Sequence, residues 1–268
     1  MLRLASRALL VAAAATATAY CSGDIQGQKD RDGWESRWAA SQIGWHRSAV
    51  NPGLVRHFES LCPSRACTVL VPLCGKSQDL LWLSSSEAGE NSVIGFELVK
   101  QALDQLHSEN NLKAAVDRVG SATRFRAQGR DLTTYACDFL ALAPDTSIQG
   151  DAAFDRGSLV ALPLEARGAY VDKLLSLMHD GGRVLLLAVE YDVPGVSPGP
   201  PHSVSESDVA RLFASRGCQY EVLHRREDSD PSPKLLKAGA KVVYEVAYLI
   251  TKTNSVCSNP GSQDNSAA

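Results

Sequence analysis

The segment TVLVPLCGKSQDLLWL, residues 68–83, decides the fold. With Cys67 before it, its first part is a continuous apolar run, which is typical of a strand buried on both faces of a parallel sheet. The residues from Ser77 onward have the pattern of a helix, so a strand, a loop and a helix follow one another. In such sheets ligands bind beyond the carboxyl ends of the strands, where the strand order reverses. The loop PLCGKS, residues 72–77, is therefore the expected ligand site.

This loop ends in Gly75-Lys76-Ser77, the last three residues of a phosphate-binding loop. The full motif needs a glycine five residues before Gly75, so that backbone amides can surround the phosphates. Leu70 stands there, and Pro72 has no N–H to offer. The dinucleotide pattern G-x-G-x-x-G is not present in the loop either. We therefore expect a ligand that places no phosphate here, with Lys76 and Ser77 capping and solvating the next helix.

Strand-like and helix-like stretches alternate from Asp32 onward. The stretch from Arg124 to Asp138 looks extended around the turn GRD and predicts a hairpin-like insertion. The last two strands follow one another with no helix predicted between them. The sequence therefore predicts an α/β fold: a doubly wound, mostly parallel seven-stranded sheet with helices on both faces and a C-terminal antiparallel hairpin. Helices are expected at 33–38, 51–61, 77–86, 100–110, 163–179 and 205–217, and strands at 67–73, 92–98, 151–157, 183–191, 220–227 and 241–252.

The composition of the 268-residue chain is ordinary for a globular protein, with 44% hydrophobic and 21% charged residues. The length suits one α/β domain with extensions. A net charge of −3 provides no basic field that would attract nucleic acid or an anionic membrane. We therefore expect a small-molecule partner and no nucleic acid.

The two ends differ from the middle. Residues 1–31 read as a targeting-like or disordered extension, with an apolar run at 8–19 that is shorter than the about twenty residues of a membrane span. Residues 253–268 read as a disordered tail. Residues 32–252 are expected to form a single domain, in which 32–62 provide N-terminal helices over the site.

The seven cysteines form no C-x-x-C pair and have no histidine pair at zinc-ligand spacing. No metal site is predicted. An odd, scattered set favours reduced thiols in a reducing compartment, with Cys67, Cys137 and Cys218 as small buried hydrophobic residues.

Glu97 is the second clue to the ligand. It ends the second expected strand, about twenty residues past the loop, where an acid accepts hydrogen bonds from ribose hydroxyls. A ribose-binding acid beside a phosphate-free loop indicates a nucleoside cofactor, and S-adenosylmethionine fits this description. The alternative is that Glu97 is only a solvated strand end.

Several motifs now carry a resemblance to a known family. They are GWESRW, GWH, VLVPLCGKSQDLLWL, VIGFEL, DFLAL, FDRGSLVALP, EYD and GPPHSVSESDVARLF, in this order. From Trp34 to Lys252 the chain closely resembles the thiopurine S-methyltransferase family. The resemblance implies a Rossmann-like fold and S-adenosylmethionine-dependent methylation of sulfur in a small aromatic or heterocyclic thiol. Some microbial members of this family also act on selenium or tellurium compounds.

The resemblance also implies roles for individual residues. Arg156 would lie near the reacting centre and stabilise a thiolate, with Asp155 orienting it. His202 stands where the family usually has Phe, which makes that wall of the site more polar. The implied catalytic residues are Arg156 and Asp155; the implied cofactor-binding residues are Trp34, Trp38, Leu73, Gly75, Glu97, Asp138, Phe139 and Arg156; the implied substrate-binding residues are Trp45, His46 and His202.

Some of these residues also suit purely structural roles, and the activity has alternatives. Tryptophans four apart also suit a core face, and Asp155-Arg156-Gly157 also suits a structural ion pair followed by a turn. The alternative acceptors are halide, thiocyanate, hydrosulfide or selenium and tellurium species, and the other class is a non-catalytic cofactor-binding protein. We expect a monomer in the cytoplasm, or in a mitochondrion or plastid if the N-terminal segment is a presequence.

Overall fold

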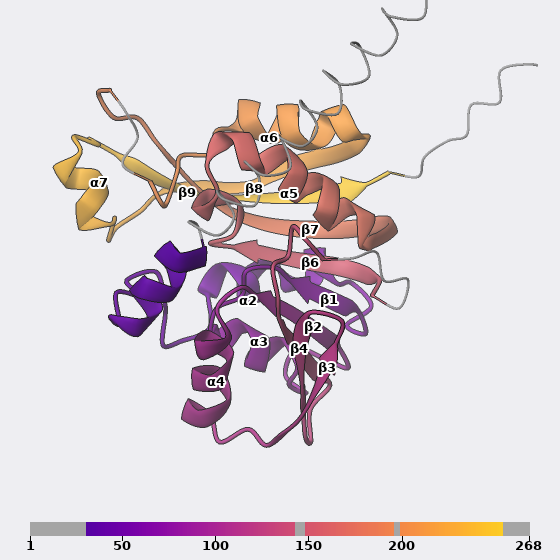
Figure 1. Ribbon diagram of the computed structural model, residues 1–268. Helices are drawn as coiled ribbons and strands as arrows, with labels where there is room; N and C mark the ends of the chain where they lie inside the picture. The colour runs from indigo at the N-terminus through magenta and orange to yellow at the C-terminus, as the bar shows by residue number, and fades with distance from the viewer. Residues whose placement is uncertain (1–30, 143–147, 196–198, 254–268) are drawn as a thin grey trace, which may run out of the picture.

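A computed structural model describes residues 31–142, 148–195 and 199–253 (Figure 1). Almost all of the predicted N-terminal extension and C-terminal tail lies outside these residues. Within them, one sheet of nine strands has the order β3-β4-β5-β2-β1-β6-β7-β9-β8. The strands are β1 (Thr68–Val71), β2 (Ser92–Glu97), β3 (Ala114–Val119), β4 (Ala122–Ala127), β5 (Leu132–Ala136), β6 (Gly150–Arg156), β7 (Met178–Tyr191), β8 (Cys218–Glu227) and β9 (Val243–Lys252).

The middle of the sheet is parallel and both margins are antiparallel. β1 lies between β2 and β6, which are parallel to it, and β5 and β7 continue the parallel part on either side. β9 runs antiparallel to both β7 and β8. The order reverses at β1, so the carboxyl ends of β1, β2 and β6 meet at one edge of the sheet.

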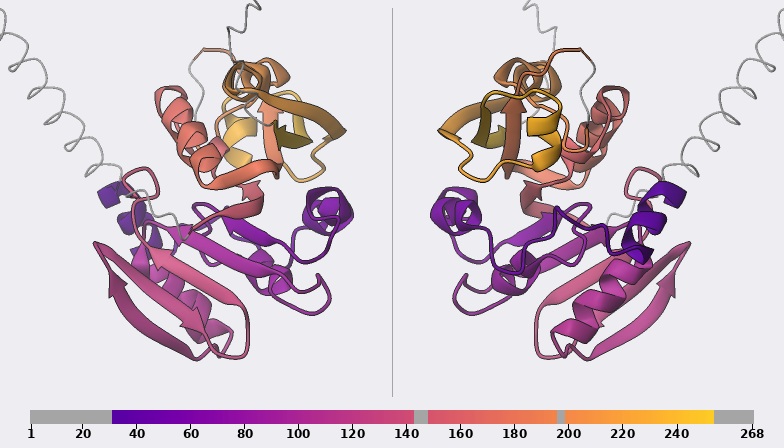
Figure 2. Two further views of the ribbon diagram at one scale, coloured as in Figure 1. Left: turned by 90° about the vertical axis from the view of Figure 1, so that its right-hand side faces the viewer. Right: turned by 90° about the vertical axis from the view of Figure 1, so that its left-hand side faces the viewer.

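Helices cover both faces of this sheet (Figures 1 and 2). Along β7, Val184 and Leu186 pack into one hydrophobic core while Leu185 and Leu187 pack into the other, because successive strand residues point to opposite faces. Each fully buried leucine of this kind contributes about 1.5–3 kcal/mol. One core holds residues of α5 (Leu164–Ser176) and α6 (Glu206–Phe213), and the other holds residues of α2 (Pro52–Leu61), α3 (Gln78–Leu83) and α4 (Lys100–Glu109).

The predicted doubly wound α/β fold is confirmed, with nine strands in place of seven. β4 and β5 form the predicted antiparallel insertion, and β3 extends it at the sheet margin. The expectation of no helix before the last strand is wrong, because α7 (Pro233–Lys237) lies between β8 and β9. This helix is five residues long, too short to show a helical period in the sequence.

Two of the predicted helices begin at capping side chains. Asn51 accepts a hydrogen bond from the Gly53 N–H at 2.7 Å, and Pro52 is the first helical residue of α2. Ser205 and Asp208 form a complete capping box at the start of α6.

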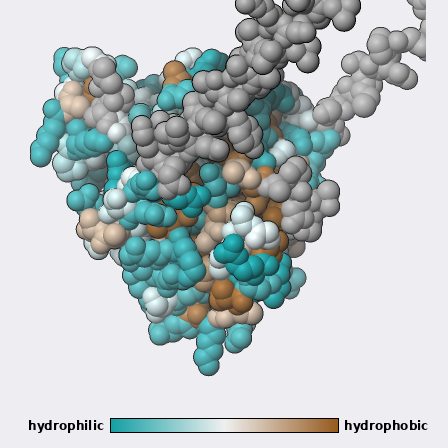
Figure 3. Space-filling model, in the orientation of Figure 1, coloured by the Kyte–Doolittle hydropathy of each residue, from teal (hydrophilic) through white to brown (hydrophobic). Residues whose placement is uncertain are grey.

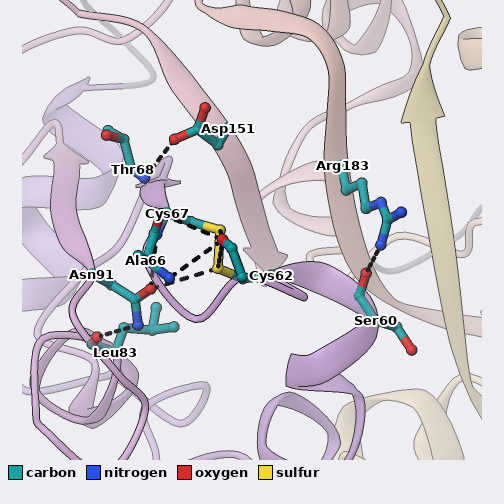
Figure 4. Close-up of a disulfide and its surroundings, with 10 residues drawn as sticks. Ser60, Cys62, Ala66, Cys67, Thr68, Leu83, Asn91, Asp151 and Arg183 are labelled. Atoms are coloured by element: carbon teal, nitrogen blue, oxygen red, sulfur yellow. Dashed lines mark hydrogen bonds between the residues drawn. A yellow bond between two sulfur atoms is a disulfide. The ribbon is translucent and has the colours of Figure 1, made fainter.

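Cys62 and Cys67 form a disulfide between the end of α2 and the start of β1, with Cα atoms 6.1 Å apart (Figure 4). This corrects the expectation of reduced thiols, which treated Cys67 as a small hydrophobic residue. The turn from α2 into β1 brings the two residues together, and sequence spacing alone does not show this. Asn91 supports the turn by accepting a hydrogen bond from the Cys67 N–H at 3.1 Å. The free cysteines among the described residues are Cys74, Cys137 and Cys218.

The surface in the orientation of Figure 1 is hydrophilic over most of its area, with smaller hydrophobic areas between (Figure 3). None of the described helices has both the length and the apolar composition that crossing a bilayer requires.

Candidate active site

The loop after β1 leaves the sheet through an unusual backbone conformation. Leu73 has φ 47° and Gly75 has φ 55°, both in the left-handed region. Glycine adopts this region readily, whereas for leucine it is uncommon and marks local strain of the kind found at ligand sites. The Ser158 hydroxyl donates a hydrogen bond to the Pro72 carbonyl oxygen at 2.7 Å. The loop is thus fixed from the β6 side.

Glu97 is buried at the end of β2, and backbone amides on both sides hold its carboxylate. Oε2 accepts from the Gly75 N–H and Oε1 from the Val99 N–H, both at 2.8 Å. Burial raises the pKa of this carboxyl, and the hydrogen bonds from the amides oppose the rise. Each carboxylate oxygen keeps a second lone pair, so Glu97 can still accept from two ribose hydroxyls. The residues present therefore fit a nucleoside cofactor.

A cluster of three tryptophans lies over this edge of the sheet. The helical segment 31–39 carries Trp34 and Trp38, and both rings meet Trp45 edge to face, with centroids 5.2 and 6.1 Å away. Trp38 is buried, and a Cβ atom added at Gly75 would meet its ring at 3.5 Å. The N-terminal segment therefore packs directly on the loop after β1.

Arg156 ends β6 beside this cluster. Its Nη1 donates a hydrogen bond to the Trp45 carbonyl oxygen at 3.0 Å. Burial lowers the pKa of the guanidinium, Asp79 raises it and Arg47 lowers it. An arginine side chain stays protonated in proteins, so Arg156 brings a fixed positive charge to the site.

Asp155 has a different place from the one expected. Its carboxylate accepts from the Tyr170 hydroxyl at 2.7 Å and from the Leu159 N–H at 3.1 Å, and it is buried on the α5 side. Neighbouring strand residues point to opposite faces, so its side chain is directed away from that of Arg156. Burial raises its pKa. The contacts of Asp155 hold the turn after β6, and none that the structure describes is with Arg156.

Asp138 and Phe139 follow β5 at the same edge. Asp138 accepts a hydrogen bond from the Leu140 N–H at 2.9 Å and so caps a turn. Phe139 is buried between Phe96 and Tyr170, with ring centroids 5.2 and 5.7 Å away. Phe139 is thus part of the core that supports the site.

Lys76 is not solvated, contrary to the sequence prediction. Its buried side chain donates to Glu109 at 2.6 Å and ties the loop after β1 to the end of α4. Ser77 does cap α3, accepting from the Asp79 N–H at 3.2 Å. His46 lies close enough to these groups for burial, Lys76 and Arg156 to lower the pKa of its imidazole.

His202 lies in the segment that follows β7 and the two prolines. Its backbone N–H donates a hydrogen bond to the Val160 carbonyl oxygen at 2.7 Å, so His202 lies beside a residue that is four positions after Arg156. Burial, Arg167 and Lys234 lower the pKa of its imidazole, and Glu165 raises it.

The structure thus brings together most of the predicted residues and adds others. Asp79 was missed: its buried carboxylate accepts from the Asn51 N–H at 2.7 Å and lies near Arg156. Its signal in the sequence was only the ordinary one of an acid in the first turn of a helix. The others that were missed are Glu109, Ser158 and Tyr170, and no sequence signal marked them.

A doubly wound sheet whose loop after β1 lacks the glycines of a phosphate-binding loop, and whose β2 ends in a buried acid, is the arrangement of an S-adenosylmethionine-dependent methyltransferase. The fold is similar to that of a Burkholderia thailandensis 1,6-didemethyltoxoflavin-N1-methyltransferase solved with S-adenosylhomocysteine. The TM-score is 0.57 at 18% identity, and the match covers 86% of this chain and 90% of that one.

The particular family is shown by the sequence. The thiopurine S-methyltransferase family model matches residues 29–253. The chain is 38% identical over 226 residues to a Vibrio cholerae thiopurine S-methyltransferase, covering 84% of this chain and 99% of the relative. It is also 38% identical over 216 residues to that of Pseudomonas fluorescens, covering 80% and 95%. The chain belongs to the thiopurine S-methyltransferase family, and it is an S-adenosylmethionine-dependent S-methyltransferase.

Proposed function

We propose that this enzyme methylates the sulfur of a small aromatic or heterocyclic thiol held between the tryptophan cluster and Arg156. The contact between the Arg156 guanidinium and the Trp45 carbonyl oxygen, at 3.0 Å, carries the proposal. It places a permanent cation beside the backbone of Trp45, whose side chain is 37% exposed and is the most exposed of the three tryptophans. A ring can pack on the indole while its sulfur meets the positive charge.

The chain supplies position and charge to the reaction. S-adenosylmethionine, when bound, supplies an activated methyl group. Arg156 stabilises the thiolate form of the acceptor, which is the nucleophilic form, and the aromatic cluster excludes water. Heterocyclic thiols are acidic enough to ionise in part at neutral pH, so holding the reacting atoms about 3–3.5 Å apart is the main task. No strong base is needed for such substrates.

The proposed cofactor contacts follow the same geometry. Glu97 accepts from the ribose hydroxyls, while Leu73 and Gly75 present the backbone of the loop. Trp34 and Trp38 cover the bound cofactor, and Asp138 and Phe139 flank its adenine ring. We assign Asp155 a positioning role through Tyr170 and Ser158. Arg156 contacts both cofactor and substrate, and Trp45, His46 and His202 line the substrate side.

A panel of acceptors tests the function. The purified full chain is incubated with S-adenosylmethionine and, separately, thiophenol, 2-mercaptopyridine, 6-mercaptopurine, hydrosulfide, thiocyanate, iodide and selenite, and S-adenosylhomocysteine is quantified. We expect turnover of the aromatic and heterocyclic thiols above all others. Preferred turnover of iodide, hydrosulfide or selenite would contradict the proposed function, and binding of S-adenosylmethionine without any turnover would indicate a non-catalytic protein.

We further propose a monomer built from a single catalytic domain over 32–252, with no nucleic-acid partner, located where S-adenosylmethionine is made or imported: the cytoplasm, a mitochondrion or a plastid. The family match over 29–253 supports the single domain, and the net charge of −3 supports the absence of a nucleic-acid partner. Size-exclusion chromatography of the purified chain with light-scattering detection tests the oligomeric state.

A further inference from the structure

The segment of residues 201–204, which carries His202, is held to its neighbours through backbone atoms. The Tyr191 hydroxyl donates a hydrogen bond to the Pro201 carbonyl oxygen at 2.7 Å. The next residue along, His202, donates from its backbone N–H to the Val160 carbonyl oxygen, also at 2.7 Å. Neither contact involves the side chain at 202, so both position the segment whichever residue stands there.

Arg167 on α5 adds the contact that joins this segment to the turn after β6. Its Nη1 donates to the Ser203 carbonyl oxygen and its Nε to the Leu162 carbonyl oxygen, both at 3.1 Å. Ser203 directly follows His202, and Leu162 lies in the turn after β6, six residues past Arg156. Because the guanidinium is planar and rigid, its two donors hold the two carbonyl oxygens at a fixed separation.

The charge of Arg167 is buried without a carboxylate partner. The residue is 2% exposed, and none of the ion pairs within 31–142, 148–195 and 199–253 includes it. Burial lowers the pKa of Arg167 and Asp208 raises it, but the Asp208 carboxylate is itself bonded to Ser205 and Arg211. A buried charge is costly unless hydrogen bonds satisfy it. Movement of either carbonyl oxygen would leave the cation unsatisfied, so Arg167 opposes such movement.

A shift of the segment 201–204 would move the His202 ring. That ring lies against the backbone of Gly199, because a Cβ atom added at this glycine would overlap its Nδ1. The ring therefore has no room to turn toward Gly199 and follows its own backbone. Arg156 immediately precedes one of the two joined segments and His202 lies in the other, so their separation determines how a ring is held in the proposed substrate site.

We propose that Arg167 is a positioning residue for the methyl transfer: it sets the separation between the turn that follows Arg156 and the segment that carries His202, and thereby the size of ring system that the acceptor site holds. This inference rests on the proposed function and deepens it by naming a residue that determines which thiols fit. Arg167 acts through the two carbonyl oxygens and does not bind the cofactor. Glu97 and the loop after β1 are held by other contacts, so cofactor affinity is expected not to depend on Arg167.

The test uses the purified full chain and compares 6-mercaptopurine, which has two fused rings, with thiophenol, which has one. We expect Arg167→Met to lower kcat/KM by about 10²-fold for 6-mercaptopurine and by about tenfold for thiophenol, because the larger ring system meets both segments and a small misplacement of the reacting atoms has this effect. The ratio of the two kcat/KM values therefore falls. Affinity for S-adenosylmethionine, measured by calorimetry, should stay as in wild type.

Two further variants make the test specific. Arg167→Lys keeps the buried charge without the rigid fork, so the ratio is expected to lie between those of wild type and Arg167→Met. Arg183→Met is the matched control, because the Arg183 Nη1 donates to the Ser60 carbonyl oxygen at 2.8 Å near the opposite edge of the sheet (Figure 4). The ratio should keep its wild-type value in this control, even if the Tm falls.

A wild-type ratio in Arg167→Met, or in Arg167→Lys if the methionine variant does not fold, would overturn the positioning role while leaving the methyltransferase function intact. A loss of S-adenosylmethionine affinity as large as the loss of kcat/KM would also overturn it, since Arg167 would then support the whole fold. If the wild type methylated neither thiol, the proposed function itself would fail and the positioning role with it.

Discussion

Arg156 and Trp45 are joined by a hydrogen bond of 3.0 Å from Nη1 to the backbone carbonyl oxygen, across 111 residues of sequence. This one contact brings the N-terminal tryptophan cluster to the end of β6. It also fixes the position of the guanidinium relative to the backbone of Trp45. The catalytic proposal depends on this relationship.

Removal of the Arg156 charge should impair catalysis more than folding. We expect Arg156→Ala to lower kcat/KM for an aryl thiol by about 10²–10³-fold, the usual effect of deleting one charge-stabilising donor. Arg156→Lys should retain part of the activity, because lysine keeps the charge without the planar fork. Arg118→Ala, at an exposed position of β3, serves as the control. Wild-type kcat/KM in Arg156→Ala at every pH would refute the role.

Glu97 should control affinity for the cofactor. Glu97→Gln keeps the shape of the side chain but removes one acceptor for the ribose hydroxyls and adds a donor that faces backbone N–H groups. We expect S-adenosylmethionine binding to weaken by about 10–100-fold, the loss of one or two charge-assisted hydrogen bonds. Calorimetry measures it, with the exposed Glu87→Gln as control. Unchanged affinity, or a changed order of preference among thiols, would argue against the ribose contact.

The hydrogen bond from Tyr170 to Asp155 should be structural. Tyr170→Phe leaves a buried carboxylate without one of its donors, so we expect a loss of about 1–3 kcal/mol in the free energy of unfolding. Tyr220→Phe is the matched control, since its hydroxyl makes a longer contact of 3.4 Å with Glu206 near the surface. Denaturant titration separates the two. Equal stability in both variants would show that the Asp155 contact does not stabilise the turn after β6.

A histidine pair away from the site should make stability depend on pH. His57 Nε2 and His224 Nδ1 lie 2.8 Å apart, and Glu245 contacts the other nitrogen of His224. Burial lowers the pKa of His57 below 6.5, with His224, Arg56 and Arg226 acting in the same direction and Glu245 against.

Since the pKa of His57 is lower in the folded state, the unfolded chain binds more protons below pH 6.5. Stability is therefore full above that pH and is lost as the pH falls toward the lowered pKa. His57→Gln should show a smaller loss between pH 7 and pH 5 than wild type, whereas the exposed His179→Gln should not. An identical pH profile for all three proteins would contradict this.

The disulfide should stabilise the fold without taking part in catalysis. For two cysteines five residues apart, the chain-entropy model gives about 2 kcal/mol. Reductant should lower the Tm of wild type and leave the double variant Cys62→Ser, Cys67→Ser unaffected. A large change in kcat on reduction would instead show that the turn before β1 influences catalysis.

The parallel centre of the sheet could be predicted from the sequence, because Thr68 to Val71 form a continuous apolar run and the helices that alternate with the strands have a clear helical period. The ligand class could be predicted as well, because Pro72 excludes a phosphate cradle and Glu97 follows at ribose spacing. The sequence did not reveal α7, which is short, or the disulfide, which depends on a tertiary turn.

The site residues that were missed share one physical reason. Lys76 and Asp79 look like ordinary helix-start residues, and only the packing of α4 and the segment before α2 buries them. Asp155 was expected to orient Arg156, as the family resemblance implied. Strand geometry separates the two side chains, and only the hydrogen bond from Tyr170 on α5 shows that Asp155 faces this helix.

The central claim is that the methyl group of the cofactor is transferred to an aryl sulfur. Following a labelled methyl group tests this claim directly. The purified chain is incubated with S-adenosylmethionine labelled with ¹³C at the methyl and with 4-mercaptobenzoate, and the product is followed by NMR. We expect a labelled S-methyl thioether and an equal amount of S-adenosylhomocysteine, both strongly reduced in Arg156→Ala. Label found on an added halide or on hydrosulfide, with none on the aryl sulfur, would show that the acceptor is not an aryl thiol.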